Sequence, residues 1–187
     1  MLTLFLVEKL VDSAAIEVDG DEAHHAIKVL RIKTGEEILV SDGAGNWVRA
    51  AVENIDKKSF SAKVLERGSQ QLKSPKLVVV QGLPKSDRVK EAIEILVESG
   101  VDLIIPWQAE RSISKWQKDS LSKWQSAAIA ATKQSRRFTT PEIIEELSLS
   151  QLLEIESETG AILVMHESAT TKLSDVVTSK FSELTEI

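Results

Sequence analysis

The pattern of apolar residues changes near Pro75, and this change limits the folds that the chain can adopt. Before it, short stretches alternate between apolar and polar residues, as in residues 60–64, which is the period of a strand with one buried face. After it, continuous apolar runs are separated by helical stretches, which is typical of parallel strands joined by helices. The sequence therefore predicts an α+β chain of two domains with different architectures.

The first half is predicted to be a small β-barrel or sandwich with one helix. Glycine-bearing turns separate the expected strands, which cover residues 2–7, 36–42, 47–55 and 59–67. A helix is expected at about 21–30, and its buried face would consist of Ala23, Ile27 and Leu30. The polar stretch 68–75 is interpreted as a linker.

The second half is predicted to be a parallel sheet covered by helices. The expected buried strands are the apolar runs 76–81, 101–106 and 161–166, and residues 141–144 form a short strand or loop. The expected helices cover 86–98 and 119–135, and a third, short one begins after Ser148. The run 161–166 should have neighbouring strands, and nothing after it supplies one, so the sheet is expected to be incomplete in this sequence.

Cysteine is absent, which excludes disulfides, a cysteine nucleophile and thiolate zinc sites. Only three histidines are present, so no metal site is expected. The N-terminus lacks the basic start and long apolar run of a signal peptide, and no stretch approaches the ~18 apolar residues of a membrane span. These features predict a cytoplasmic protein without a membrane or metal partner.

The net charge of −6 argues at first against a nucleic-acid partner, but the charge is unevenly distributed. Residues 142–187 hold ten of the 29 acidic residues and two of the 23 basic residues, so residues 1–141 hold 19 acidic and 21 basic residues. A mildly basic body with an acidic C-terminal part is compatible with RNA binding, because local patches matter more than the sum.

Three loops after the expected parallel strands carry charged side chains, and ligands of such sheets bind beyond the carboxyl ends of the strands. The first loop carries Lys85 near a helix N-terminus, which suits an anion. The second carries Glu110 and Arg111, and the third begins with His166. Together these residues suit a polar ligand that bears a phosphate.

Each candidate also has a structural interpretation. Lys28 and Arg31 can belong to an ordinary solvated face, and the cations of residues 134–137 end a helix, where they complement its dipole. Trp124 lies on an apolar helical face and is expected in the core, and a lone histidine such as His166 is often only a hydrogen-bonding residue. The residue pattern alone leaves these alternatives open.

Four stretches carry a family resemblance: HHAIKVLR at 24–31, DGAG at 42–45, QGLPKSDRVKEAIEILVESGVDLIIPWQAERS at 81–112 and AAIAATKQSRR at 127–137. In order and spacing they resemble the RsmE family of bacterial ribosomal RNA uridine-N3 methyltransferases, in the SPOUT (α/β-knot) superfamily. MHE at 165–167 fits less specifically, and Glu-Ser-Gly-Val at 98–101 stands where the family usually has Glu-Leu-Gly-Val.

The resemblance implies a PUA-like β-barrel over residues 1–70 that binds RNA, and a SPOUT-type α/β domain with a knotted parallel sheet over residues 74–187. It implies a homodimer, S-adenosylmethionine as methyl donor, and methylation of N3 of a uridine in 16S ribosomal RNA of the small subunit. That reaction needs a base for the N3 proton and a sulfonium held close and in line.

The resemblance also suggests roles for individual residues. The residues expected to bind RNA are His25, Lys28, Arg31 and Lys85. Arg111 and Arg136 are expected to act at the catalytic site, by holding the RNA or the target uridine near the cofactor. The residues expected at the rim of the cofactor pocket are Met165, His166 and Glu167.

Family members continue with a Gly-Pro-Glu-Gly-Gly loop that is absent from this sequence. Residues 1–187 are therefore expected to bind S-adenosylmethionine weakly or not at all. One alternative is a non-catalytic RNA-binding or ribosome-assembly protein that keeps the barrel and has lost the knot. Another is an unrelated phosphate-binding α/β enzyme that uses Lys85 and Arg111, but it leaves the helix at 24–31 unexplained.

Overall fold

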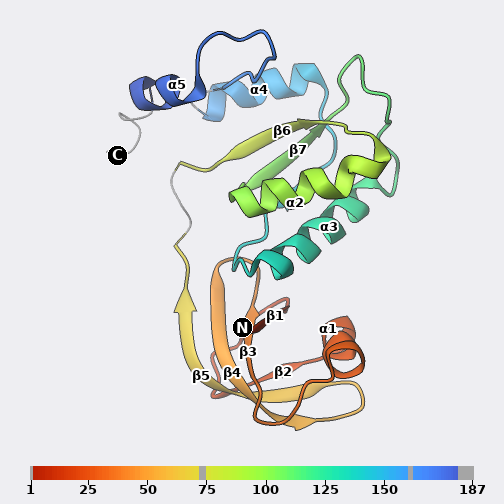
Figure 1. The fold of residues 1–187 in the computed structure, drawn as a ribbon, viewed down its shortest axis with the longest axis vertical. Coiled ribbons are helices and arrows are strands. Elements are labelled where there is room, and N and C mark those ends of the chain that lie inside the picture. The colour runs from red at the N-terminus through yellow and green to blue at the C-terminus, as the bar shows by residue number, and fades with distance from the viewer. Residues whose placement is uncertain (1, 72–74, 160–161, 181–187) are drawn as a thin grey trace.

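The computed structural model describes residues 2–71, 75–159 and 162–180. These residues form two sheets, each with a hydrophobic core of its own, which follow one another along the long axis of the molecule (Figure 1). The first sheet is mostly antiparallel and the second is parallel with helices, so the predicted α+β class is confirmed.

The first sheet is a curled half-barrel with the strand order β1-β3-β4-β5-β2. Its strands are β1 (Thr3–Leu6), β2 (Ala15–Val18), β3 (Glu37–Ser41), β4 (Asn46–Ile55) and β5 (Phe60–Ser69). β1 pairs in parallel with β3, and the other pairs are antiparallel. The four expected strands are confirmed, whereas the sequence analysis missed β2.

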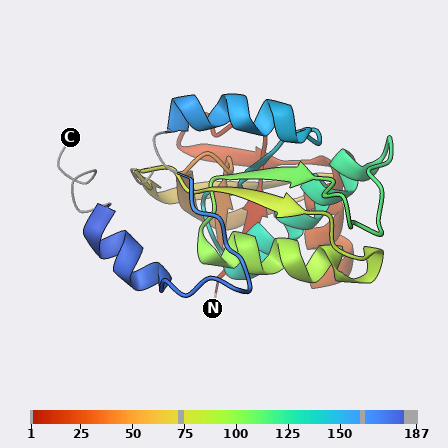
Figure 2. The ribbon, with the colours of Figure 1, turned by 90° about the horizontal axis from the view of Figure 1, so that it is seen from above.

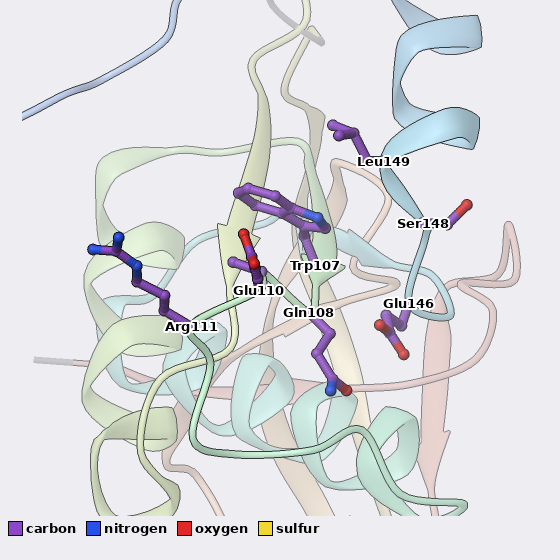
Figure 3. A pocket seen from close by; sticks show the side chains of 8 residues that line it. Trp107, Gln108, Glu110, Arg111, Glu146, Ser148 and Leu149 are labelled. Carbon is purple, nitrogen blue, oxygen red and sulfur yellow. The ribbon is translucent and has the colours of Figure 1, made fainter.

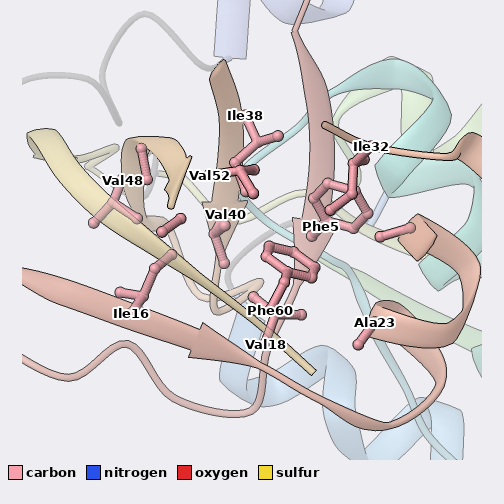
Figure 4. Packing of buried hydrophobic residues seen from close by; sticks show 13 residues of the cluster. Phe5, Ile16, Val18, Ala23, Ile32, Ile38, Val40, Val48, Val52 and Phe60 are labelled. Carbon is pink, nitrogen blue, oxygen red and sulfur yellow. The ribbon is translucent and has the colours of Figure 1, made fainter. Parts of the chain in front are cut away.

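Alternating side chains of these strands fill the core of the half-barrel (Figure 4). Phe5 and Phe60 meet edge to face, with ring centroids 5.6 Å apart. β4 buries Val48 and Val52, while register shifts between β4 and β5 bend both long strands around the core. Each fully buried aliphatic or aromatic side chain contributes about 1.5–3 kcal/mol to folding.

The helix expected at 21–30 changes type along its length. It starts as α1 (Gly20–His24) and continues as a π-helix (His25–Leu30). Because a π-helix has a wider turn, the buried positions shift: Ala26 is buried, whereas Leu30 is 43% exposed. The expected burial of Leu30 is therefore wrong.

The second sheet contains three parallel strands in the order β6-β7-β8. They are β6 (Val78–Gly82), β7 (Leu103–Trp107) and β8 (Glu142–Ile143). The helices are α2 (Val89–Ser99), α3 (Ser120–Ser135), α4 (Leu149–Thr159) and α5 (Leu173–Lys180). Figures 1 and 2 show α2 and α3 on one side of the sheet and α4 on the other.

The core of this domain lies between the sheet and the helices α2 and α3. Ile93 and Val97 of α2 pack with Trp124 of α3 against Ile104 of β7. Trp124 is 4% exposed, so its expected place in the core is confirmed. α2 ends at Gly100, whose φ of 84° is the left-handed conformation that glycine adopts most readily.

Two expectations about buried strands are wrong. β6 is at the edge of the sheet that the described residues form, and Val80 on it is 43% exposed. Residues 162–166 form no strand with any described residue, and residue 161 lies outside the described part of the chain. The exposed apolar side chains of this run are Ile162, Leu163, Val164 and Met165. An apolar run becomes a buried strand only where another strand satisfies its backbone groups, and none of the described strands pairs with this run.

The expected linker at 68–75 begins too early. Residues 68 and 69 continue β5, where Gly68 pairs with Trp47 of β4. Residues 72–74 of the expected linker lie outside the described part of the chain. β5 extends to these residues because the indole of Trp47 on β4 covers the backbone at Gly68. Gly68 has no side chain that would clash with this ring.

Candidate active site

A hollow of about 810 Å³ lies at the carboxyl end of β7. One wall is the loop that leaves β7, and the other is the segment that leads into α4. The lining residues are Trp107, Gln108, Ala109, Glu110, Arg111, Glu146, Ser148 and Leu149 (Figure 3). The size is in the range of small-molecule and nucleobase sites. Of the 107–112 loop, residues 107–111 line this hollow.

Backbone pairing brings the two walls together. The N–H of Leu147 donates to the carbonyl of Pro106 at 3.1 Å, and Leu147 forms a parallel bridge with Trp107. Ser148 directly precedes α4, and its N–H donates to the side-chain oxygen of Gln151 in the first turn at 2.9 Å. Helix α4 therefore starts directly beside the indole of Trp107.

The lining groups differ in chemistry. Figure 3 shows the ring of Trp107 with Glu110 on one side and Leu149 on the other, so an apolar surface lies next to a carboxylate. Arg111 extends away from Glu146 and Ser148 on the opposite side of the hollow. This arrangement offers stacking and hydrogen-bond acceptance to a ligand with a flat polar ring, while the guanidinium of Arg111 points outward at the edge of the hollow.

The remaining candidate residues of the sheet edges do not line this hollow. Lys85 is exposed just before the 3₁₀ turn Ser86–Arg88. Met165, His166 and Glu167 are also exposed, and the Nδ1 of His166 is bonded to the backbone and hydroxyl of Ser168, at 3.1 and 2.6 Å. The three loops that the sequence analysis brought together are therefore not joined in one cavity by the described residues.

The basic motif at 24–31 lies on the half-barrel. Lys28 and Arg31 are exposed, and His25 is half-buried. Arg31 ends the π-helix in the left-handed conformation, with a φ of 56°, which is rare for a residue with a side chain. Val29 and Leu30 beside them are also exposed, so the motif presents both cationic and apolar groups.

Arg136 lies at the junction of the two domains. It ends α3, and its Nε donates to the carbonyl of Leu2 at 3.0 Å. The guanidinium of Arg137 lies over Gly100 at the end of α2. These positions agree with the structural interpretation of the cations at 134–137, and Arg136 does not line the hollow.

The domain junction itself contains residues that the sequence analysis missed. The N–H of Gly45 donates to the carbonyl of Phe138 at 2.8 Å, and the ring of Phe138 stacks on Trp47 with centroids 5.1 Å apart. Lys133 of α3 contacts Glu22 of α1 at 2.5 Å. Both resembling stretches DGAG and AAIAATKQSRR thus supply residues to the junction, but spacing alone gives no sign that they meet.

In the described ranges, no group of three or more histidine, aspartate or glutamate side chains is placed to hold a metal ion. The helices in those ranges are all too short or too polar to cross a membrane.

Known proteins resemble this chain along both domains. The model of an RNA methyltransferase domain matches residues 71–186, and that of an RNA methyltransferase PUA domain matches residues 18–65. Ribosomal RNA small subunit methyltransferase E of Mycobacterium tuberculosis is 37% identical over 190 residues, which cover 97% of this chain and 72% of that protein. The Bacillus subtilis protein of the same name is 26% identical over 165 residues, with coverages of 86% and 64%.

Solved structures share the fold. The crystal structure of ribosomal RNA small subunit methyltransferase E from Neisseria gonorrhoeae bound to S-adenosyl methionine superposes with a TM-score of 0.75 at 23% identity, covering 94% of this chain and 74% of that one. With both domain models matched and this identity to a relative along most of its length, the chain belongs to the ribosomal RNA small subunit methyltransferase E family of RNA methyltransferases.

Proposed function

We propose that the chain functions in an S-adenosylmethionine-dependent methyltransferase that modifies N3 of a uridine in 16S ribosomal RNA of the small subunit. The observation that carries this proposal is the 37% identity to the Mycobacterium tuberculosis protein across both domains. The hollow beside Trp107 supports it, because a single uracil ring has the flat, polar shape that the lining groups suit.

The two domains divide the work in this proposal. Residues 1–70 bind RNA, and residues 74–187 hold the target base and the methyl donor. Lys28 and Arg31 contact phosphates, since both are exposed cations on one helical motif. His25 and Lys85 extend this contact along the RNA.

Arg111 has a specific task in the reaction. Loss of the N3 proton leaves a negative charge that is shared by N3 and the two carbonyl oxygens of the uracil ring. A guanidinium offers planar N–H donors to such oxygens, so Arg111 stabilises the charge as it develops. Figure 3 shows Glu110 beside the indole of Trp107. In this proposal its carboxylate accepts a hydrogen bond or the proton from N3 of the uracil ring.

S-adenosylmethionine supplies the electrophilic methyl group when it is bound. The segment 164–167 fits one side of such a ligand, because Val164 and Met165 offer exposed apolar surface and Glu167 offers a charge opposite to that of a sulfonium. We place Met165, His166 and Glu167 at the rim of this site. Arg136 keeps its proposed role toward RNA through its terminal nitrogens, since the bond to Leu2 uses Nε.

We also infer a homodimer that acts in the cytoplasm, where ribosomal RNA is its partner. Exposed leucines on α4 support an association of copies, since Leu149 and Leu153 are each 58% exposed. Light scattering after gel filtration should give twice the mass of one chain. A monomer at micromolar concentration would contradict this part of the proposal.

The central experiment is methyl transfer to small-subunit ribosomal RNA at millimolar S-adenosylmethionine, so that weak cofactor binding does not hide transfer. A methyl group on N3 blocks base pairing, so reverse transcription should stop at one uridine. Arg111→Ala should lower the rate by about 100-fold, whereas Lys115→Ala, an exposed cation of the same loop, should not. RNA binding without any transfer would instead support the non-catalytic assembly protein.

A further inference from the structure

Among the described residues, one partly buried ion pair connects the two domains at their junction. Lys133 Nζ lies 2.5 Å from Glu22 Oε1, and the side chains are 23% and 22% exposed. Each of the other ion pairs in the described residues lies within one domain, and each of their side chains is at least 33% exposed. Glu22 also accepts a long hydrogen bond of 3.4 Å from the N–H of Leu6.

The pair lies between the two candidate functional regions. Glu22 is on α1, which continues directly into the π-helix with Lys28 and Arg31. Lys133 is in the last turn of α3, and Trp124 of the same helix packs in the core against β7, the strand that leads into the hollow. If the basic motif moves relative to the hollow, either this contact breaks or α1 and α3 move together.

Other contacts also join the two domains. The turn at 42–45 docks on Phe138–Thr140 through the bonds Gly45 N–H to Phe138 O and Thr140 N–H to Gly43 O, each 2.8 Å long, and Arg136 Nε donates to the carbonyl of Leu2 just before β1. These contacts reach the 42–45 turn and the N-terminal strand, whereas the Glu22–Lys133 pair holds α1, the helix that continues into the basic motif.

We propose that Glu22 and Lys133 are positioning residues, which fix the RNA-binding motif at 24–31 relative to the hollow beside Trp107. The proposal rests on the proposed function for its RNA part only. It predicts that the charge pair serves RNA binding through geometry, although neither residue touches RNA.

Removing Glu22 separates this proposal from simple electrostatics. Glu22→Gln deletes a negative charge near the RNA-binding motif, so electrostatics alone would strengthen RNA binding. Positioning predicts the opposite, a loss of about fivefold or more in affinity. Lys133→Met should give a similar loss with an unchanged slope of log affinity against log salt, because no phosphate contact is lost. Lys133→Arg keeps the pair and should restore affinity.

The geometry can be measured directly, because the chain has no cysteine. Labels on Lys58→Cys and Lys90→Cys, two exposed positions in different domains, report the distance between the domains. Glu22→Gln and Lys133→Met should broaden the distance distribution. Lys123→Met is the matched control. Lys123 also lies on α3, its ion pair with Asp119 just before the helix is exposed, and its loss should leave the distance distribution unchanged.

Each outcome decides between the hypotheses. An unchanged distance distribution in Glu22→Gln, or RNA affinity equal to or above that of the wild type, would overturn the positioning role. A reduced salt slope in Lys133→Met would show that Lys133 contacts phosphate instead. If the wild type does not bind small-subunit ribosomal RNA at all, the proposed function fails, and the distance measurement still tests the interdomain contact.

Discussion

Replacing Gly68 with alanine tests the packing at the domain junction. Gly68 lies under the indole of Trp47, and a Cβ built there would be 2.4 to 2.7 Å from three atoms of that ring. The same ring stacks on Phe138, at an interplanar angle of 14°. A methyl group at position 68 must therefore displace the indole relative to Phe138.

The cost can be worked from these distances. Carbon atoms in contact lie about 3.5–4.0 Å apart, so the ring must move by roughly 1 Å. Overpacking of this kind costs about 1–3 kcal/mol, and loss of the ring stack adds about 0.5–1.5 kcal/mol. Alanine gains about 0.4–1 kcal/mol through the unfolded state. The expected net loss is about 0.5–4 kcal/mol, or a fall in Tm of about 1–16 °C for a chain of this length.

The assay is urea unfolding followed by circular dichroism and tryptophan fluorescence. Gly82→Ala is the matched control, since a Cβ there meets nothing within 4 Å and the backbone is not left-handed. In a Phe138→Leu background the penalty of Gly68→Ala should shrink, because the ring has room to move. Equal stabilities of Gly68→Ala and Gly82→Ala would refute the packing argument.

Three further predictions concern RNA, cofactor and pH. Lys28→Ala and Arg31→Gly should each weaken RNA binding and lower the slope of log affinity against log salt by about 1. Glycine is chosen at position 31 because it adopts the left-handed backbone there without strain. Unchanged slopes in titrations at several salt concentrations would show that both residues are only solvated surface charges. In isothermal titration, residues 1–187 should bind S-adenosylmethionine at least about tenfold more weakly than the Mycobacterium tuberculosis relative does. The reason is that Met165 is 74% exposed, whereas tight sites enclose most of their ligand. Equal affinity would contradict this prediction. The hydrogen bond with Lys123 lowers the pKa of Asp119, so the stabilising effect of this bond is present above the ordinary carboxyl pKa and is lost as pH falls through the lowered value. The free energies of unfolding of Asp119→Asn and wild type, measured in urea, should therefore differ at neutral pH and converge in acid. A difference that persists in acid would point to another cause.

Periodicity predicted most elements because their burial is set within the element. Strands β3, β4 and β5 alternate between core and solvent, and that alternation is visible in the letters. The stripe of α2 and the core position of Trp124 follow from helical spacing in the same way. β2 escaped detection because its four residues contain a glutamate and offer only two buried positions.

Features that depend on a distant partner could not be predicted. The exposure of Val80 follows from the absence of a described strand beside β6, and no local pattern encodes that. The Glu22–Lys133 pair joins residues 111 positions apart, and each reads locally as an ordinary solvated charge on a helix. Likewise, the residues at 25–30 give no sequence signal that distinguishes a π-helix from an α-helix.

Topology also limits what Arg111 and Arg136 can do together. Arg111 follows β7 and Arg136 precedes β8, so the two lie at opposite edges of a parallel sheet. A strand of five residues spans about 16 Å, which is more than a uracil ring covers, so within one chain both arginines can contact the same RNA but not the same base. Arg136→Ala should therefore weaken binding of RNA with and without the target uridine equally, whereas Arg111→Ala should mainly slow transfer. Selective loss of binding to the uridine-containing RNA in Arg136→Ala, measured by competition between the two RNAs, would instead show that Arg136 reaches the target base.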